Sequence, residues 1–266
     1  MMRALWTAGG GMQAQQFNVD VISNNLANVN TTGYKKERAE FKDLLYETVN
    51  RAYILEGTGK PVNLQVGHGA VPVATVKNFS SGNLEKTDNP LDFAINGDAF
   101  FTIRSASGEV EYTRDGSFKL SVSDEGNILT TSDGLQVLDD AGNQIIVNVE
   151  ASKINVTLSG ELTYIDENGS TASLGQKIAL VKFPNNQGLE ALGNNLFKQN
   201  SASGAPVLND ELPDRSTIQQ GYLESSNVQV VEEMVKLIVA QRAYEINSKA
   251  IQSADEMLGL ANNLRK

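Results

Sequence analysis

Few residues in this chain have the types and spacing that catalysis requires. The only histidine, His68, lies in a glycine-rich stretch with no serine or cysteine nucleophile pattern beside it, so a histidine base would lack a group to activate. The chain contains no cysteine, which excludes disulfides, thiolate metal sites and cysteine nucleophiles. We therefore interpret His68 as a surface or interface residue.

Acidic residues offer a second route to chemistry, as glycosidase carboxylates or as calcium ligands. The candidates all lie in turns rich in glycine or asparagine, and none has the spacing of an EF-hand; they are Asp124, Asp133, Asp139, Asp140 and Asp166. Aspartate side chains stabilise such turns by accepting hydrogen bonds from nearby backbone amides. Turn formation accounts for these residues without catalysis or metal binding.

Binding sites for nucleotides or sugars have no signature either. The triplet Gly9, Gly10 and Gly11 lies within a helical pattern, whereas a phosphate-binding loop joins a strand to a helix. Trp6 and the seven tyrosines are scattered along the chain, so they indicate no stacking platform for single-stranded nucleic acid or sugars. We predict a protein that is not an enzyme, with no catalytic residue, no metal and no cofactor.

The charge is concentrated in the middle of the chain. Residues 1–38 and 223–266 together carry nine Lys/Arg and eight Asp/Glu, a net charge of +1, whereas residues 39–222 carry thirteen and twenty-four, a net charge of −11. An acidic middle argues against nucleic acid or an anionic membrane as its partner. We interpret it as a solubilising surface. No stretch approaches the roughly 20 apolar residues of a membrane span, and no cleavable signal peptide is expected.

Both ends of the chain show helical periodicity, with apolar residues at alternating spacings of three and four. The N-terminal seam is Leu5, Ala8, Met12, Gln15, Val19, Ile22, Leu26 and Val29. The C-terminal seam is Leu237, Ala240, Tyr244, Asn247, Ile251, Ala254, Leu258 and Ala261, flanked by Ala243, Ala250, Met257 and Leu264. Alternating large and small residues favour close, coiled-coil-like pairing.

Local signals mark where these helices begin and weaken. Ser226 and Gln229 have the spacing of a capping box, so the C-terminal helix is expected to start there and run to Leu264. In the N-terminal helix, the triplet Gly9 to Gly11 costs roughly 1 kcal/mol per residue relative to alanine. An asparagine-rich segment then ends this helix, and Gly33 can adopt the left-handed conformation found at helix ends.

The residues between the helices show two different sequence patterns. Residues 39–76 lack a clean period and are punctuated by glycine and proline, which indicates a long extended linker. From residue 77 to residue 222, short β-branched runs such as Phe100 to Ile103 alternate with turns such as Asp115-Gly116, which indicates a β barrel or sandwich. The fold class is therefore α+β: paired terminal amphipathic helices (1–38 and 223–266), an extended linker (39–76) and a mainly antiparallel all-β module (77–222).

Two motifs at the ends resemble a known family. The stretch from Ile22 to Lys35 is similar to the N-terminal signature of the bacterial flagellar rod and hook proteins, and it contains Asn24, Asn25, Leu26, Ala27, Asn28, Thr32, Gly33 and Tyr34. The stretch from Gly221 through Lys249 resembles their C-terminal signature. The linker, with Leu44, Leu45 and Tyr46, most resembles that of the distal rod members. The asparagine side chains are expected to cap the helix, and the resemblance adds possible contacts to neighbouring subunits.

This resemblance implies a structural protein of the flagellar basal body. Copies of the chain would polymerise helically through an inner tube of terminal helices, with Leu5, Met12, Val19, Ile22, Leu26, Leu237, Tyr244, Ile251 and Leu258 at the subunit interfaces. The linker would brace adjacent subunits through Leu44, Leu45 and Tyr46, and the β module would face the P- and L-ring bushing proteins. Proximal rod subunits, the hook protein and the type III export apparatus are the other implied partners, and the implied location is the rod that spans the periplasm, reached without signal cleavage.

Alternative functions remain within and outside this family. A proximal rod or hook subunit would share both signatures, although a hook protein typically carries a further outer domain for which this length leaves little room. A secreted β-domain cell-wall hydrolase belongs to a different class, and it requires a paired acid and base in one cleft.

Overall fold

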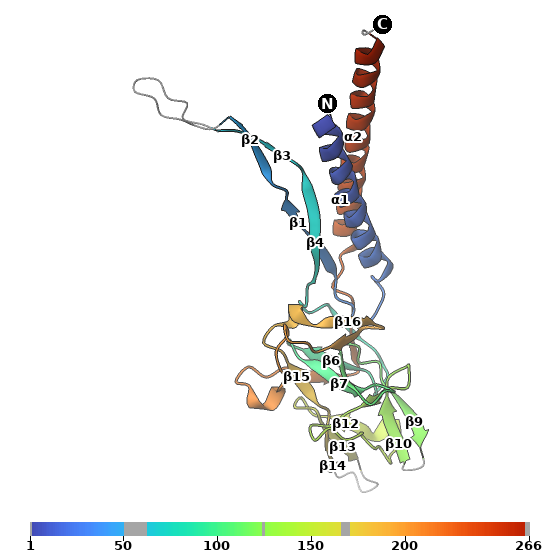
Figure 1. The fold of residues 1–266 in the computed structure, drawn as a ribbon. Coiled ribbons are helices and arrows are strands. Elements are labelled where there is room, and N and C mark those ends of the chain that lie inside the picture. Colours follow the sequence, from blue (N-terminus) through green and yellow to red (C-terminus); the bar gives the residue numbers. More distant parts are fainter. Residues whose placement is uncertain (1, 51–62, 124–125, 166–170, 264–266) are drawn as a thin grey trace. The chain divides into compact units, whose positions relative to one another are not determined.

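The computed structural model describes residues 2–50, 63–123, 126–165 and 171–263 (Figure 1). These residues form two compact units. The helical unit comprises the described residues within 2–27, 37–76 and 229–263, and the β unit comprises those within 28–36 and 77–228. The structure therefore has an N-terminal helix, a C-terminal helix and a β-rich middle, as the sequence predicts.

Two helices dominate the helical unit. Helices α1 (Met2–Ala27) and α2 (Val230–Asn263) lie side by side. The N-terminal part of α1 contacts the middle of α2, where Gly11 faces Asn247, and its C-terminal part reaches the start of α2, where Asn25 bonds to Glu233. The helices are therefore antiparallel. With 34 residues, α2 is about 50 Å long.

The two helices bury a narrow stripe of mostly small residues, namely Ala8, Ala14, Val21, Ile22 and Asn25 of α1 and Glu233, Ala240 and Ala254 of α2. Most of the predicted seam residues are less covered. Tyr244 is 42% exposed, and the half-buried ones are Leu5, Met12, Val19, Leu26, Leu237, Ile251 and Leu258. One helix pair covers only part of each apolar face, so the larger side chains remain accessible in the single chain. Coiled-coil geometry stays a prediction.

Helix α2 starts three residues later than a cap at Ser226 predicts. The helix begins at Val230, and its first turn is closed by the Glu233 amide donating to the Gln229 carbonyl at 3.0 Å. The Ser226 hydroxyl accepts a bond from the Val228 amide at 3.4 Å, which is local and makes no capping box. The preceding residues are held in the β unit, where Ser225 donates to Asn83. The helix therefore begins only after these residues, at Val230.

The linker, expected to be an extended segment, forms β structure in its described part. Strand β1 (Glu37–Asp43) pairs with β4 (Ala70–Lys77), and β2 (Tyr46–Asn50) pairs antiparallel with β3 (Leu64–Gly67). Most residues of this β ribbon are exposed. Pairing satisfies the backbone groups that an isolated extended chain would leave to water.

The β unit is built around one large sheet. Its strands follow the order β16-β17-β8-β7-β11-β10-β9, and β15 pairs with both β7 and β18. In chain order these are β7 (Phe100–Arg104), β8 (Val110–Thr113), β9 (Lys119–Ser123), β10 (Gly126–Thr130), β11 (Gln136–Val137), β15 (Leu180–Lys182), β16 (Glu190–Gly193), β17 (Leu196–Lys198) and β18 (Val207–Leu208). The paired neighbours run antiparallel.

Smaller sheets complete this unit. A three-stranded sheet contains β12 (Ile154–Val156), β13 (Glu161–Ile165) and β14 (Thr171–Lys177). Strand β6 (Phe93–Asn96) pairs with β19 (Thr217–Gln220), and β5 (Leu84–Lys86) pairs with β20 (Tyr222–Glu224). Short 3₁₀ helices also lie between strands, namely η1 (Ala151–Lys153), η2 (Asn186–Gly188) and η3 (Asn209–Glu211).

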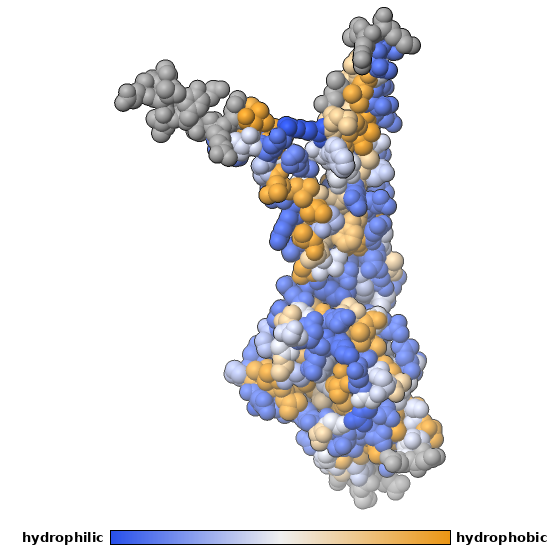
Figure 2. Space-filling model, in the orientation of Figure 1, coloured by the Kyte–Doolittle hydropathy of each residue, from blue (hydrophilic) through white to orange (hydrophobic). Residues whose placement is uncertain are grey.

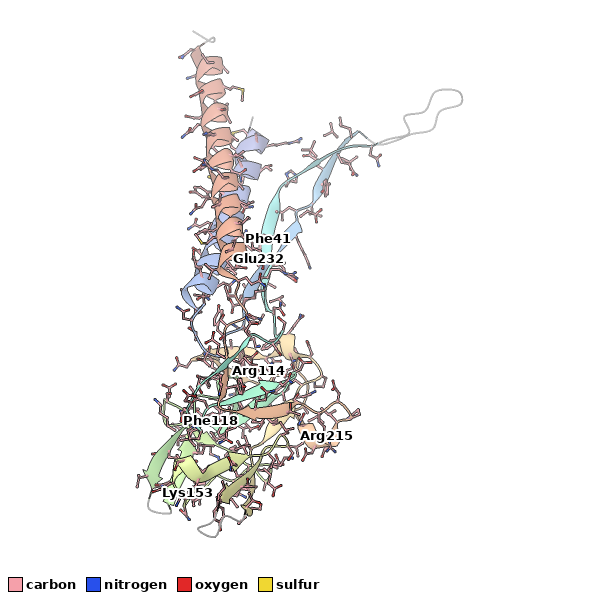
Figure 3. All side chains as sticks on the ribbon, turned by 180° about the vertical axis from the view of Figure 1, so that it is seen from behind. Phe41, Arg114, Phe118, Lys153, Arg215 and Glu232 are labelled. Carbon is pink, nitrogen blue, oxygen red and sulfur yellow. The ribbon has the colours of Figure 1, made fainter. Side chains whose placement is uncertain are left out.

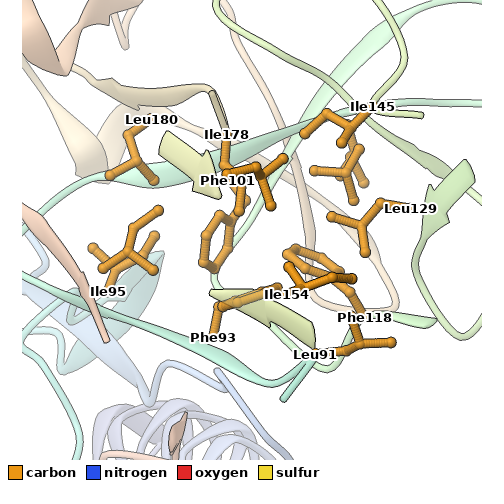
Figure 4. Close-up of a cluster of buried hydrophobic side chains, with 14 of the residues drawn as sticks. Leu91, Phe93, Ile95, Phe101, Phe118, Leu129, Ile145, Ile154, Ile178 and Leu180 are labelled. Atoms are coloured by element: carbon orange, nitrogen blue, oxygen red, sulfur yellow. The ribbon is translucent and has the colours of Figure 1, made fainter. Parts of the chain in front are cut away.

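Two apolar clusters hold the β unit together. The larger includes Phe93, Phe101 and Phe118 with isoleucines and leucines from several strands (Figure 4). The second is aromatic, and the rings of Phe79 and Phe100 meet edge to face at 5.5 Å. Burying each such side chain stabilises the fold by about 1.5–3 kcal/mol.

Candidate assembly site

Parts of the two signature stretches, residues 28–35 and 221–228, belong to the β unit and contact each other there. The Gly33 amide donates to the Glu224 carbonyl at 2.7 Å, and the Asn227 amide donates to the Tyr34 carbonyl at 3.4 Å. Gly33 has a φ of +69°, so its left-handed conformation is as expected, but α1 has already ended at Ala27. Gly33 therefore serves the contact with Glu224 and not the helix end.

A buried group of charges lies under this contact. Lys35 and Glu224 are each 1% exposed, and Lys35 Nζ donates to Glu224 Oε1 at 2.7 Å and to the Ser80 carbonyl at 2.9 Å. The Gly82 amide donates to the same Glu224 oxygen at 2.8 Å. Removing one partner of a buried pair costs about 3–5 kcal/mol, because it leaves an uncompensated charge.

Arg114 supplies a second cation from the interior of the β unit (Figure 3). Its Nη1 donates to the carbonyls of Gly97 and Ala99 at 2.8 and 2.7 Å. Its Nε lies 3.5 Å from Glu224 Oε2, an ion pair without an aligned hydrogen bond, since neither atom has a hydrogen-bond partner. Glu224 is thus balanced by two cations.

Burial sets the protonation behaviour of this group. Desolvation, aided by the positive charge of Arg114, lowers the pKa of Lys35 from 10.5 to about 8, although Glu224 opposes the shift. Desolvation also lowers the pKa of Arg114, again opposed by Glu224. Burial therefore disfavours the charged forms of Lys35 and Arg114, and their shared partner Glu224 partly offsets this desolvation cost.

The asparagine cluster has mainly internal partners. Asn25 is 1% exposed, and within the helical unit its side chain accepts the Glu37 amide at 2.8 Å and donates to the Glu37 carbonyl and to Glu233 Oε2. Asn28 Oδ1 accepts the Thr31 hydroxyl at 3.2 Å, and the Thr32 carbonyl accepts from Asn195. Of the predicted motif, Tyr34 and Gly33 are also buried, whereas Asn24 and Ala27 are exposed. Contacts of this cluster with other subunits stay a prediction.

The predicted linker contacts are at the surface. Leu44, Leu45 and Tyr46 are 42%, 86% and 57% exposed. Leu44 lines an open apolar hollow together with Leu5, Trp6, Gly9, Gly10, Gln13 and His68. His68 therefore lies beside apolar groups of α1. The ribbon adds other accessible apolar residues, including Val49 and Leu64, and Figure 2 shows hydrophobic patches on its surface.

An apolar face of α2 also lacks a covering element among the described residues. Val231, Val235 and Val239 are 76%, 56% and 63% exposed, and Ile246 is 66% exposed. The three valines recur every four residues and therefore lie on one side of the helix. Apolar surface of this kind on a soluble chain marks an interaction site.

Two of the aspartates considered for catalysis take part in a turn or an ion pair. Asp139 Oδ1 accepts the amides of Ala141 and Asn143 at 3.1 and 2.6 Å, which is the predicted turn role. Asp140 lies 3.5 Å from Lys177 Nζ, and Asp133 is exposed. Asp124 and Asp166 lie outside the described residues. Within the described ranges, no three acidic, histidine or cysteine side chains are grouped so as to hold a metal ion, and no helix is apolar and long enough to cross a membrane.

Three family models match the chain. They are the flagellar basal body rod protein over residues 5–35, the flagellar hook protein FlgE/F/G D1 domain over 94–164 and the flagellar basal body rod FlgEFG protein C-terminal region over 219–264. The flagellar basal-body rod protein FlgG of Borreliella burgdorferi is 48% identical over 274 residues, with all of both chains covered.

The chain belongs to the flagellar rod and hook protein family. The FlgG proteins of Caulobacter vibrioides and Bacillus subtilis are 44% and 36% identical, with 99% and 100% of this chain and all of both relatives covered. Similarity to rod proteins over the full length identifies the chain as a structural subunit of the flagellar rod.

Several residues of the site were not singled out from the sequence. Lys35, Glu224 and Asn227 all lie within the signature stretches, but Lys35 and Glu224 are 189 positions apart. Local periodicity carries no information about partners at that separation. The sequence signal that could have indicated this pair is the charged residue inside each signature, Lys35 in one and Glu224 in the other.

Proposed function

We propose that the chain is the distal rod subunit and that its copies polymerise into a helical tube, which transmits torque from the motor to the hook. The observation that carries the proposal is the apolar face of α2. Its valines are exposed in the single chain, and burying apolar surface is the dominant driving force for association. A contact between unlike surfaces of identical copies that does not close generates a helical filament.

The parts of the chain have separate roles in this proposal. Residues 1–38 and 223–266 form the inner tube through Leu5, Met12, Val19, Ile22, Leu26, Leu237, Tyr244, Ile251 and Leu258. Residues 39–76 brace adjacent subunits, for which the exposed Leu45 and Tyr46 are suited. Residues 77–222 face outward toward the P- and L-ring proteins, and their ten Lys/Arg and twenty Asp/Glu give a net charge of −10 that keeps that surface hydrated.

The remaining partners follow from membership of the rod family. Proximal rod subunits would contact one end of the polymer and the hook protein the other. The subunit would be exported by the flagellar type III apparatus without cleavage and would assemble across the periplasm.

Electron microscopy of purified protein tests the proposal. Concentrated full-length chain is compared with a variant that retains residues 28–228, because residues 28–36 belong to the β unit. We expect straight tubes from the full chain and separate particles from the truncated variant. Curved filaments would indicate a hook subunit, and separate particles from both samples, even with preassembled proximal rods added as nuclei, would contradict polymerisation.

A further inference from the structure

The chain crosses between the helical unit and the β unit four times, after residues 27, 36, 76 and 228. Any force that passes along the backbone between the units must use these four connections. On the β-unit side, the adjoining segments are bonded to one another by a set of residues that we name the clasp. It consists of Lys35, Lys36, Glu224 and Asn227 with the backbone of Asn78, Ser80 and Gly82.

The buried half of the clasp is centred on one carboxylate oxygen. Glu224 Oε1 accepts from Lys35 Nζ at 2.7 Å and from the Gly82 amide at 2.8 Å, and Lys35 Nζ also donates to the Ser80 carbonyl at 2.9 Å. Hydrogen bonds to ionised groups are roughly twice as strong as neutral ones. This oxygen therefore joins the segments that end at residue 36, begin at residue 77 and end at residue 228.

The outer half of the clasp joins the same segments through one amide side chain. Asn227 Oδ1 accepts the Lys36 amide at 2.8 Å, and Asn227 Nδ2 donates to the carbonyls of Asn78 and Ser80 at 2.8 and 3.1 Å. The Asn78 amide donates to the Lys36 carbonyl at 2.9 Å. Asn227 thus uses both ends of its amide: its oxygen bonds the segment that ends at residue 36, and its nitrogen bonds the segment that begins at residue 77.

This arrangement differs from what stability alone requires. Buried charges are expensive to desolvate, and a well-packed apolar cluster often stabilises a fold as well or better. A network in which every segment is bonded to the other two has a different property, because displacement of one strand loads the bonds of all three. Bonds loaded together resist force better than bonds broken one at a time.

We propose that the clasp is a load-sharing junction, in which Glu224 and Asn227 bond three of the chain segments at the unit boundary so that they resist force together. This inference rests on the proposed torque-transmitting function. It assigns the mechanical coupling to named residues of the β unit and not to the subunit interfaces.

The first test asks whether the clasp acts as one element in purified full-length chain. The Asn227→Ala variant is compared with wild type by amide hydrogen exchange. The Gly82 amide bonds to Glu224 and not to Asn227, so its exchange changes only if the clasp acts as one element. We expect the exchange of Gly82, Lys36 and Asn78 to rise together by about tenfold, the change expected for loss of one or two hydrogen bonds. Faster exchange at Lys36 alone would overturn the proposal.

A matched control is available in the same unit. Asn209 also uses both ends of its amide, donating to the Ser216 carbonyl at 2.8 Å and accepting the Ser216 amide at 2.7 Å, but it joins residues only seven positions apart. The Asn209→Ala variant should leave exchange at Lys36, Asn78 and Gly82 unchanged. The amides of β7 report whether the core of each variant is intact.

The second test measures rotation in cells whose own rod gene is replaced by the wild-type chain, Asn227→Ala or Asn209→Ala. We expect basal bodies in all three, equal rotation at low viscous load, and loss of rotation at high load only for Asn227→Ala. If the wild-type chain forms no rods, the proposed function itself fails. If rods form and Asn227→Ala rotates as wild type at high load, the clasp proposal alone is overturned.

Discussion

At the scale of single residues, Lys35 has a pKa well below its ordinary value. Its ammonium group bonds to Glu224 and to the Ser80 carbonyl, and its pKa falls from 10.5 to about 8. Desolvation is the largest cause, and Arg114 adds to it. The charged lysine is thus tolerated in the interior because Glu224 faces it, not because the site favours a cation.

This shift predicts a pH dependence of stability. Between about pH 8 and 10.5 the unfolded chain holds the Lys35 proton while the native chain has released it, so the unfolded state binds more protons and the free energy of unfolding rises with pH. The slope is at most about 1.4 kcal/mol per pH unit. Below pH 8 both states are protonated, and this contribution is flat.

Urea denaturation of wild type and Lys35→Met at pH 7, 8.5 and 10 measures this effect. Methionine fills a similar volume but cannot titrate, so the difference between the two proteins should change with pH only above about pH 8. Arg114 stays beside Glu224 in the variant and limits the cost of losing the lysine. Parallel pH profiles for the two proteins would show that Lys35 is not shifted in the folded state.

At the scale of elements, two irregularities of the helices are explained by their packing. The glycine triplet weakens α1, and Asn247 interrupts the apolar seam of α2. A Cβ atom at Gly11 would lie 2.9 Å from Asn247 Nδ2, whereas one at Gly9 would meet nothing within 4 Å. Gly11 therefore makes room for a polar side chain of the opposite helix.

Substitutions at the two glycines should consequently differ. Gly9→Ala gains roughly 1 kcal/mol of helix propensity without a clash, so helicity of full-length monomer should increase. Gly11→Leu should decrease it, because the new side chain collides with Asn247. The double variant Gly11→Leu with Asn247→Ala should recover part of the loss. Far-ultraviolet circular dichroism measures each, and equal effects at Gly9 and Gly11 would show that the contact is absent.

The same elements show how far sequence patterns reach. Periodicity of three and four is a local property, and it predicts both helices; alternation and turn residues likewise predict the β-rich middle. The β ribbon was missed, because the pairing of Tyr46 with Gly67 spans a stretch of glycines without alternation. The Lys35–Glu224 pair was missed because register and long-range partners are decided by tertiary packing. The start of α2 was misplaced for the same reason, since Ser225 is bound to Asn83.

At the scale of the whole molecule, the surface of α2 is the feature that a single chain does not explain. Val231, Val235 and Val239 are more than half exposed, and their spacing places them on one side of the helix. Burying each in a polymer would gain about 1.5–3 kcal/mol. Repetition of that gain in every subunit would favour assembly without requiring tightly folded isolated helices.

A charge on this face should prevent assembly without unfolding the subunit. Val239→Glu would have to desolvate a carboxylate in each subunit contact, and an unpaired buried charge is strongly unfavourable. Gln241→Glu is the matched control, because position 241 is exposed and lies about 200° around the helix from position 239. Light scattering should show polymer from wild type and Gln241→Glu but not from Val239→Glu, while near-ultraviolet circular dichroism of the β unit stays the same in all three. Polymerisation of Val239→Glu at the wild-type concentration would place the subunit contact on another face of α2.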